Sequence, residues 1–214
     1  MTEPPPAIRA AFDAVTADIA LTAIGEQPRL RADAARNRRR LLEVAAELSA
    51  EHGAANVTME AVAAAAGVGK GTVFRRFGDR AGLMVALLDH HEQQIQAAFL
   101  MGPPPLGPDA PPLDRLRAFG PAVIRHEHTF RDLYTAVAAH PRRRFNPSYH
   151  VKHTHIALLL RESGAPGDIE LVAHTLLGYL NTTLDDYLIS GRGMPLERLN
   201  SGWHDLVTCL TGGK

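Results

Sequence analysis

The sequence contains a single cysteine, Cys209, and no run of apolar residues long enough to cross a membrane. One cysteine excludes an intrachain disulfide framework and any zinc finger built on cysteine pairs. A helix that spans a bilayer needs about 20 consecutive apolar residues. Residues 1–31 also lack the basic segment and apolar core of a signal peptide. We therefore expect a cytoplasmic protein that is neither exported nor embedded in a membrane.

The motifs of the common enzyme classes are also missing. The chain has no P-loop, no dinucleotide-binding glycine pattern, no Gly-x-Ser-x-Gly elbow and no His-Glu-x-x-His zinc motif. The densest group among its 11 histidines is His150, His153 and His155. On a helix with 3.6 residues per turn, the last of these lies about 140° around from the first. We therefore expect no enzyme activity, no cofactor and no metal site.

Net charge is absent overall but not locally. The chain carries 23 basic and 23 acidic side chains, yet ten of the basic and only six of the acidic ones lie between Arg29 and Arg80. That segment is therefore basic, and the remainder is acidic to the same extent. A local cationic footprint is typical of a surface that binds phosphates with release of counterions.

Residues 58–77 have the pattern of two short helices separated by a tight turn. Thr58 is a good N-cap, because its hydroxyl can satisfy an otherwise unpaired amide. Gly67 follows the last apolar position and can adopt the left-handed conformation that closes a helix. A second helix is expected from about Lys70 to Phe77, within roughly three residues of the first. This spacing predicts a helix-turn-helix DNA reader.

The second helix of this pair has one apolar face and one basic face. Val73 and Phe77 are spaced i, i+4 and can pack inward together. Arg side chains on the opposite face can make bidentate contacts with guanine. Gly69 and Gly71 each destabilise a helix interior by roughly 1 kcal/mol relative to Ala, which close backbone approach to another surface would offset. The outward residues are Lys70, Thr72, Arg75 and Arg76.

The string Ala-Gly-Val-Gly-Lys-Gly-Thr-Val-Phe-Arg-Arg-Phe-Gly-Asp-Arg-Ala-Gly-Leu, residues 66–83, resembles the signature of the tetracycline-repressor (TetR) family. The apolar positions of a preceding helix that ends at Gly53 are similar to that family's first helix, so the resemblance covers residues 35–95. It implies an all-α chain with a three-helix helix-turn-helix domain, joined to a helical ligand-binding and dimerisation domain. It further implies a homodimeric transcriptional regulator, most often a repressor, which a small-molecule effector releases from a near-palindromic operator in double-stranded DNA.

The resemblance also implies roles for individual residues. Phosphate contacts would come from Thr58, Lys70, Thr72 and Arg80. Three positions depart from the family, because Gly69 replaces a frequent Ser, Phe74 a frequent Tyr, and Arg75 a frequent His or Asn. Two hydroxyls are lost and arginine charge is gained, which favours an operator rich in GC pairs. The candidate DNA-binding residues are Arg40, Thr58, Gly69, Lys70, Gly71, Thr72, Phe74, Arg75, Arg76 and Arg80.

We expect three segments along the chain. Residues 1–34 form an N-terminal arm whose apolar stripe either docks on its own dimer or is mobile, and we favour a mobile arm. Residues 35–95 form the DNA-binding domain, and residues 96–214 form the effector domain. A long helix capped by Asp79 would connect the two as a lever. Further helices are expected at 113–126, 130–140, 148–163, 169–189 and 196–210.

The effector domain offers two sets of candidate residues. A ligand cavity between the middle helices would be lined by aromatic and polar groups, namely Phe119, His126, Phe130, Tyr134, His153 and His174. The last two helices carry apolar stripes that either build the core of the chain or meet a second copy in a four-helix interface. The candidate dimerisation residues are Leu177, Leu180, Leu184, Leu188, Leu199, Trp203 and Leu206.

Other interpretations remain open at this stage. The chain could be a helical enzyme or a ligand-sequestering protein with a degenerate reader that no longer binds DNA. It could also be an architectural DNA binder without an effector. The pair of helices over residues 58–77 could also be an ordinary helical hairpin whose charges are merely solvated. The N-cap, the turn glycine, the inward apolar pair and the basic face are nevertheless all consistent with a DNA-binding helix-turn-helix.

Overall fold

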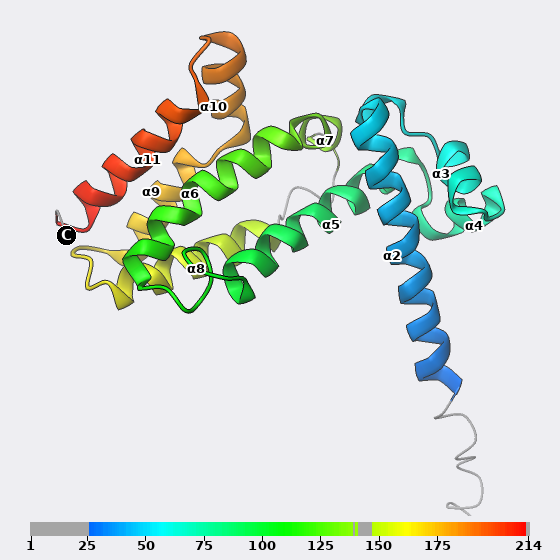
Figure 1. Ribbon diagram of the computed structural model, residues 1–214, viewed down its shortest axis with the longest axis horizontal. Helices are drawn as coiled ribbons and strands as arrows, with labels where there is room; N and C mark the ends of the chain where they lie inside the picture. The colour runs from blue at the N-terminus through cyan, green and yellow to red at the C-terminus, as the bar shows by residue number, and fades with distance from the viewer. Residues whose placement is uncertain (1–25, 139, 141–146, 213–214) are drawn as a thin grey trace, which may run out of the picture.

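The computed structural model describes residues 26–138, 140 and 147–212. All regular elements among these residues are helical, as the sequence predicted. Two groups of helices lie at opposite ends of the molecule, and one long helix joins them (Figure 1). The amphipathic stripe that we expected between Ile8 and Ala23 lies outside the described residues. Among the described residues, no helix combines the length and the hydropathy that a membrane crossing needs.

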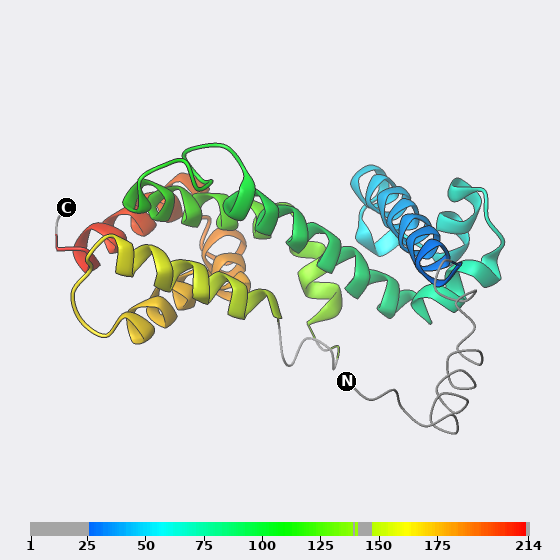
Figure 2. The same ribbon diagram turned by 90° about the horizontal axis from the view of Figure 1, so that it is seen from below.

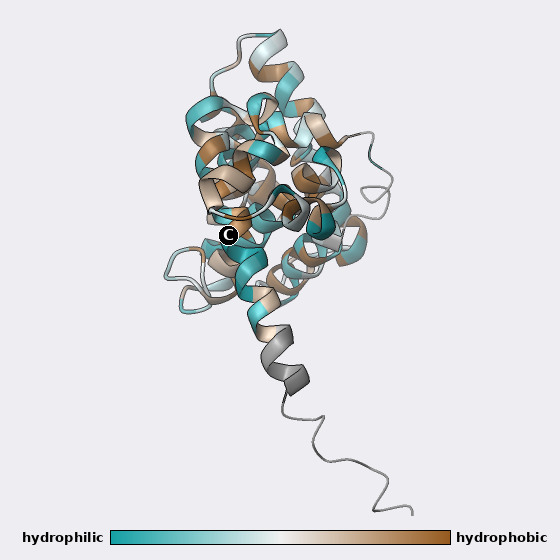
Figure 3. Cartoon of the chain, turned by 90° about the vertical axis from the view of Figure 1, so that its right-hand side faces the viewer, coloured by the Kyte–Doolittle hydropathy of each residue, from teal (hydrophilic) through white to brown (hydrophobic). Residues whose placement is uncertain are grey.

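The first group contains one long helix followed by three short elements, and it begins earlier than expected. Helix α2 (Glu26–His52) is followed by the short turn η2 (Ala54–Asn56), α3 (Met59–Ala66) and α4 (Lys70–Phe77). The boundary that we placed after residue 34 falls inside α2. Pro28 does not interrupt this helix, because a proline is tolerated in the first turn, where amides have no intrahelical partner. The arginines from residue 36 to residue 40 consequently stand on a helix, and the part of α2 that projects from the domain is mainly hydrophilic (Figure 3).

Helix α5 (Arg80–Met101) is the expected lever, and it belongs to both halves of the molecule. Asp79 caps it by accepting a hydrogen bond at 2.7 Å from the Gly82 amide. In its first half Leu83, Leu87 and Leu88 are completely buried in the core of the reader. Near its end Phe99 is completely buried in the core of the second group. The helix therefore cannot move without disturbing one core or the other.

The core of the reader extends beyond the predicted domain. Helix α7 (Arg131–Val137) contacts both α5 and η2, and it inserts Leu133 and Val137 among the buried residues of the first group. Both side chains are almost fully buried. A helix that begins at Arg131, well beyond the expected boundary at residue 95, thus completes the hydrophobic core of the DNA-binding half.

The second group is a layered helical bundle. It contains α6 (Pro112–Thr129), α8 (Pro147–Glu162), α9 (Ile169–Tyr179) and α11 (Leu196–Leu210). Helices α8 and α9 run side by side, and α11 lies across α6 (Figures 1 and 2). Trp203 of α11 is completely buried against α6, and its indole nitrogen donates to the Leu116 carbonyl at 3.0 Å. Gly120 allows this approach, since a Cβ there would lie 2.1 Å from the indole ring.

This packing corrects most of the expected dimer residues. Trp203 and Leu199 are buried within the chain, as are Leu177 and Leu180, so these four side chains cannot meet a second copy. Their apolar stripes build the core instead, which was the alternative left open. Leu184 remains exposed, while Leu188 and Leu206 are half-buried.

The segment predicted as one helix over 169–189 is broken. Helix α9 ends at Tyr179, and a short helix α10 (Thr182–Asp186) begins after Asn181, whose side chain accepts from the amides of Thr183 and Leu184. A π-helical turn, η4 (Tyr187–Gly191), follows directly. The apolar periodicity in the sequence continues through this break, although Leu184, the leucine of α10, is exposed and Asp185 is the buried residue of that helix.

Candidate nucleic-acid interface and effector domain

The turn between α3 and α4 has the geometry that the sequence predicted. The Thr58 hydroxyl accepts from the Ala61 amide at 3.1 Å and so caps α3. Gly67 is left-handed, with φ 67° and ψ 33°, and closes the helix. The Val68 amide then donates to the Ala63 carbonyl at 3.0 Å. These bonds satisfy the end of α3 within two residues, which fixes the direction in which α4 begins.

Helix α4 is held to the domain by one face. Val73 is completely buried, and Phe77 packs against the same core as a half-buried side chain. The Arg38 guanidinium lies 5.7 Å from the centre of the Phe77 ring, within the range of a cation–π contact. The inward pair predicted from the i, i+4 spacing is therefore confirmed.

The opposite face of α4 is open to an external partner. Arg75 and Arg76 are exposed and Thr72 is half-buried. A Cβ built at Gly69 or Gly71 would meet nothing within 4 Å. The two glycines are therefore not required by contacts inside the chain. Gly69 is the N-cap of α4, where glycine is tolerated, whereas Gly71 lies within the helix and destabilises it. Both leave room for a surface outside the chain to approach the backbone.

Lys70 at the start of α4 is engaged by the preceding helix. Its ammonium pairs with the Glu60 carboxylate of α3, and both side chains are more than half exposed. The hydrogen bond from Lys70 lowers the pKa of Glu60 below its ordinary value. Lys70 also lies 5.4 Å from the centre of the Phe74 ring. An exposed pair of this kind is weak, so a phosphate can replace the carboxylate as the partner of Lys70.

Arg80 has a different environment from the other candidate DNA contacts. Its Nε donates to the Val57 carbonyl at 2.9 Å. One terminal nitrogen donates to the carbonyls of Ala54 and Ala55 at 2.8 and 2.9 Å. The guanidinium thus ties the loop that precedes α3 to the first turn of α5. The structure thus gives Arg80 a positioning role, and the phosphate contact implied by the resemblance stays a prediction.

Arg40 lies close to the turn of the reader. It is exposed on α2 and lines a surface hollow together with Ala66 and Val68. This hollow places Arg36 and Arg40 of α2 beside the turn that joins α3 to α4. Helices α3 and α4 lie at the same end of the molecule as α2 (Figure 1).

The six candidate ligand residues do not line one cavity. Phe119 is completely buried in the second core beside Phe99 and Trp203. His153 and His174 stack on each other at 4.1 Å on the surface between α8 and α9. The remaining three, His126, Phe130 and Tyr134, lie at the junction of the two halves.

This junction contains aromatic contacts between the lever and the effector domain. The His91 ring of α5 stacks on Phe130 at 3.8 Å, and His126 contacts the edge of the same ring at 4.9 Å. The Tyr134 hydroxyl donates to the Glu92 carboxylate at 3.3 Å. Burial, the Lys152 charge and His91 together lower the pKa of His126 to about 4. A neutral His126 is therefore built into the packing of the lever.

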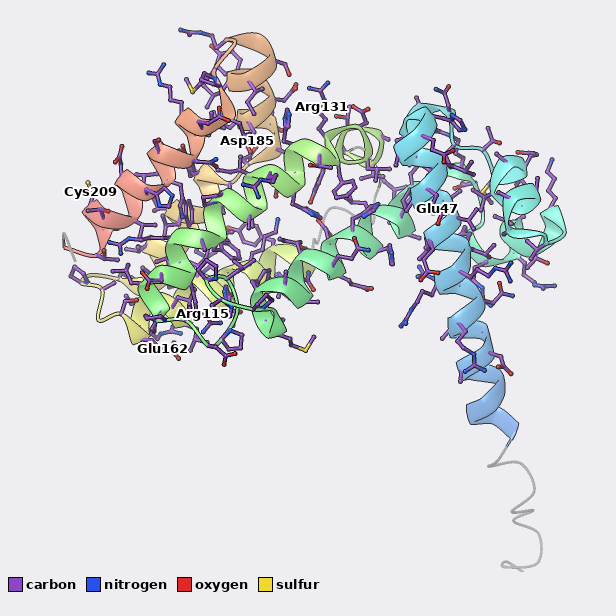
Figure 4. All side chains as sticks on the ribbon, in the orientation of Figure 1. Glu47, Arg115, Arg131, Glu162, Asp185 and Cys209 are labelled. Carbon is purple, nitrogen blue, oxygen red and sulfur yellow. The ribbon has the colours of Figure 1, made fainter. Side chains whose placement is uncertain are left out.

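A buried ionic centre lies beside this junction and was missed by the sequence analysis. The Lys152 ammonium of α8 donates to the Glu127 carboxylate of α6 at 2.7 Å, and both side chains are over 90% buried. The Thr182 hydroxyl of α10 donates to the other Glu127 oxygen at 2.6 Å. Asp185, also buried, completes the group where α10 approaches α6 (Figure 4). The residues come from three separate helices, so no local spacing signals them.

Comparisons place the reader in a known family. Residues 41–87 match the sequence model described as bacterial regulatory proteins, tetR family. No curated protein sequence matches the chain.

Solved structures share the fold over most of the chain. A transcriptional regulator from Rhodococcus sp. RHA1 has a TM-score of 0.61 at 21% identity and covers 82% of this chain and 96% of its own. A putative transcriptional regulator from Saccharomonospora viridis, solved in complex with choline, has a TM-score of 0.60 at 21% identity, covering 81% and 96%. The complex of SmeT with triclosan has a TM-score of 0.54 at 18% identity, covering 81% and 90%. The similarity extends across both halves and establishes the shared fold.

Proposed function

This chain belongs to the TetR family of bacterial regulatory proteins, and we propose that it is a repressor that a small molecule releases from a near-palindromic operator. The family and the similar structures are transcriptional regulators rather than enzymes. The observation that carries the proposal is the outer face of α4, where two glycines open the backbone between exposed basic side chains.

Helix α4 is the element that enters the major groove. Gly69 and Gly71 let its backbone approach the DNA closely, while Arg75 and Arg76 reach towards base edges. Arginine contacts guanine at two atoms, so these residues favour GC pairs. Phosphate contacts hold the helix in register, and they come from Thr58, Lys70, Thr72 and Arg40. Phe74 is exposed beside Lys70 and offers an apolar contact to a thymine methyl or a sugar.

A second copy of the chain supplies the other half of the reading surface. Twofold symmetry then requires a near-palindromic operator, with half-sites about 34–36 Å apart or a multiple of that distance. Because Trp203 and Leu199 are buried within the chain, only the outer faces of the last helices remain available to a second copy. Leu184 is exposed there, and Leu188 and Leu206 are half-buried, so these three of the expected dimer residues remain candidates.

A small molecule acts by favouring one arrangement of the two readers. The second group of helices is linked to the reader through α5 and α7, so a ligand there changes the spacing of the recognition helices. The structures with choline and triclosan support a small-molecule effector, because they share this fold. The ligand shifts the population by at most its difference in affinity for the two arrangements.

Fluorescence anisotropy on labelled DNA from the region upstream of the protein's own gene tests the proposal. We expect salt-sensitive binding, because phosphate neutralisation releases counterions. Arg75→Ala should weaken binding by about 1–3 kcal/mol and relax base preference. The matched control is Arg198→Ala, which removes an exposed arginine from α11 at the opposite end of the molecule. Equal binding by the parent and the Arg75 variant, or binding that salt does not weaken, would contradict the proposal.

A further inference from the structure

A cleft of about 720 Å³ lies between the reader and the effector domain, and we call it the junction cleft. The C-terminal part of α2 and the turn η2 line it on the reader's side. His91 of α5 and the corner between α6 and α7 supply the rest of the lining, where α7 contacts η2 (Figure 1). Pockets for drug-sized ligands occupy about 300–1,000 Å³ and occur preferentially between domains. The junction cleft therefore has the size and the position of a ligand site.

The buried part of the lining is apolar and aromatic. The ring of His91, a residue that is 7% exposed, stacks on Phe130 with 3.8 Å between the ring centres. Leu133 and Ala54 line the same cleft and are almost fully buried. A ring or an alkyl chain of a ligand would gain hydrophobic stabilisation on these side chains. Aromatic faces also attract cations that lie within about 6 Å.

The formal charges in the lining are negative. Glu47 of α2 and Asp132 of α7 line the cleft from opposite sides, and both are exposed, while the described lining residues include no lysine and no arginine (Figure 4). Glu47 has no ion-pair or hydrogen-bond partner in the part of the chain that the structure describes. The Asp132 carboxylate lies 3.7 Å from Arg131 Nε in an exposed pair, which is weak. The cleft therefore favours a cation over an anion.

His91 adds an unsatisfied acceptor to this lining. Its Nδ1 donates to the side-chain oxygen of Gln94 at 3.2 Å, so the lone pair of the neutral ring lies on Nε2. Burial lowers the pKa of His91 below its ordinary value, which keeps the ring neutral at pH 7. Nε2 has no hydrogen-bond partner among the described residues. A polar atom in a buried side chain is normally paired, and an ammonium group carries the donors that this one lacks.

We propose that the junction cleft binds an amphipathic organic amine in its protonated form. The apolar body of the amine packs on Phe130 and Leu133, and its ammonium group donates to His91 Nε2. The carboxylates of Glu47 and Asp132 balance the positive charge. An anion of the same size would meet two like charges, and an uncharged analogue would leave both carboxylates without a counter-charge.

A ligand in the junction cleft touches both halves of the molecule. Glu47 and Ala50 stand on α2, whose buried leucines belong to the core of the reader, while Asp132 stands in the first turn of α7. An amine held between them fixes the angle between the reader and the effector domain. It then favours one arrangement of the two readers of a dimer, and we expect this arrangement to fit the operator poorly. This step rests on the proposed function, because it assumes that the reader binds DNA.

Calorimetric titration with naphthylmethylammonium chloride at pH 7 tests the site directly. We expect the parent to bind this amine, because its ring and its charge match the lining. The parent should bind neither naphthylmethanol, the uncharged analogue, nor naphthaleneacetate, an anion of similar size. No binding of the amine, or equal binding of all three compounds, overturns the proposal.

Variants of the lining locate the binding site. The double variant Glu47→Gln, Asp132→Asn keeps the shape of both side chains and should weaken amine binding at least about tenfold, which corresponds to roughly 1.4 kcal/mol. Ala50→Phe places a ring in the cleft from an exposed position of α2 and should abolish binding. The control is Glu162→Gln, which removes an exposed carboxylate at the far end of α8 and should bind like the parent (Figure 4). Parent-like affinity in either the double variant or Ala50→Phe overturns the site.

The second readout is DNA binding by anisotropy in the presence of naphthylmethylammonium chloride, compared with sodium chloride at equal ionic strength. We expect the amine to weaken DNA binding by the parent beyond the effect of the sodium salt, and to have no extra effect on the double variant. DNA binding by the parent that the amine does not weaken overturns the effector role of the cleft, while the regulator function stands. Amine binding that depends on Glu47 and Asp132, in a chain without DNA affinity, supports the site and contradicts the proposed function.

Discussion

At the scale of single residues, Arg80 shows that a charge next to a DNA reader can serve the fold of that reader. Its guanidinium donates to three backbone carbonyls, those of Ala54, Ala55 and Val57. A planar group with donors in a fixed fork suits this task, whereas an ammonium is a single point of charge. The residue therefore positions the segment that precedes α3.

We expect Arg80→Lys to lower the free energy of unfolding by about 1–3 kcal/mol, because a lysine cannot span the carbonyls of Ala54 and Val57 together. Urea unfolding of the purified protein measures the change. Arg76→Lys, at an exposed position on α4, should stay within about 0.5 kcal/mol of the parent. A loss of DNA affinity in Arg80→Lys without any loss of stability would instead assign this arginine to a phosphate.

Much of the reader could be predicted from the sequence, because its signals are local. The Thr58 cap, the Gly67 turn and the inward Val73 each depend on residues within one or two helical turns. The role of Arg80 could not be predicted in this way, since its partners lie more than 20 residues away. The same reason hid Asp185, whose charged neighbours Glu127 and Lys152 lie on other helices.

At the scale of helices, the crossing of α6 and α11 decides the shape of the effector domain. The two helices meet where Gly120 faces the ring of Trp203. Sequence periodicity correctly gave the extent of α11 but not its partner, because an apolar stripe fits a neighbouring helix and a second subunit equally well. The break between α9 and α10 was missed for a related reason, since Asn181 can cap a helix or sit within one.

We expect Gly120→Ala to destabilise the protein by roughly 1–3 kcal/mol or more, because the added methyl group would overlap the indole ring, which is packed on all sides. Thermal unfolding followed by circular dichroism measures this effect. Gly178→Ala is the matched control, because a Cβ at this position in α9 meets nothing within 4 Å and alanine favours a helix. The control should be neutral or slightly stabilising. Equal melting temperatures for the two variants would show that α11 does not pack closely on α6.

At the scale of the whole molecule, buried histidines link stability to pH. Burial and the Arg115 charge lower the pKa of His155 to about 4, and His126 at the junction is lowered to about the same value. Their ordinary value is about 6.5, so the unfolded chain binds protons that the folded chain does not as the pH falls from about 6.5 to 4. Protonation therefore favours unfolding in this range.

We expect each of the two rings to remove about 1–2 kcal/mol of stability between pH 7 and pH 5. The measurement compares urea unfolding at the two pH values for the parent and for the double variant His126→Leu, His155→Leu. Asp185 shifts stability in the opposite sense over the same range, since its raised pKa keeps a proton on the folded chain. This contribution is common to both proteins and cancels in the comparison. If the parent and the double variant lost the same free energy of unfolding between pH 7 and pH 5, His126 and His155 would not be the source of the pH dependence.

The placement of Leu133 and Val137 in the core of the reader also affects how the molecule can be divided. A fragment that ends with α5 would lack these two side chains and would expose the apolar surface that they cover. Transplanting this reader onto another effector domain would therefore require α7, or an equivalent helix, to travel with it. The unit that can be exchanged is discontinuous in sequence: the first helices, the lever and one short helix that lies beyond α6.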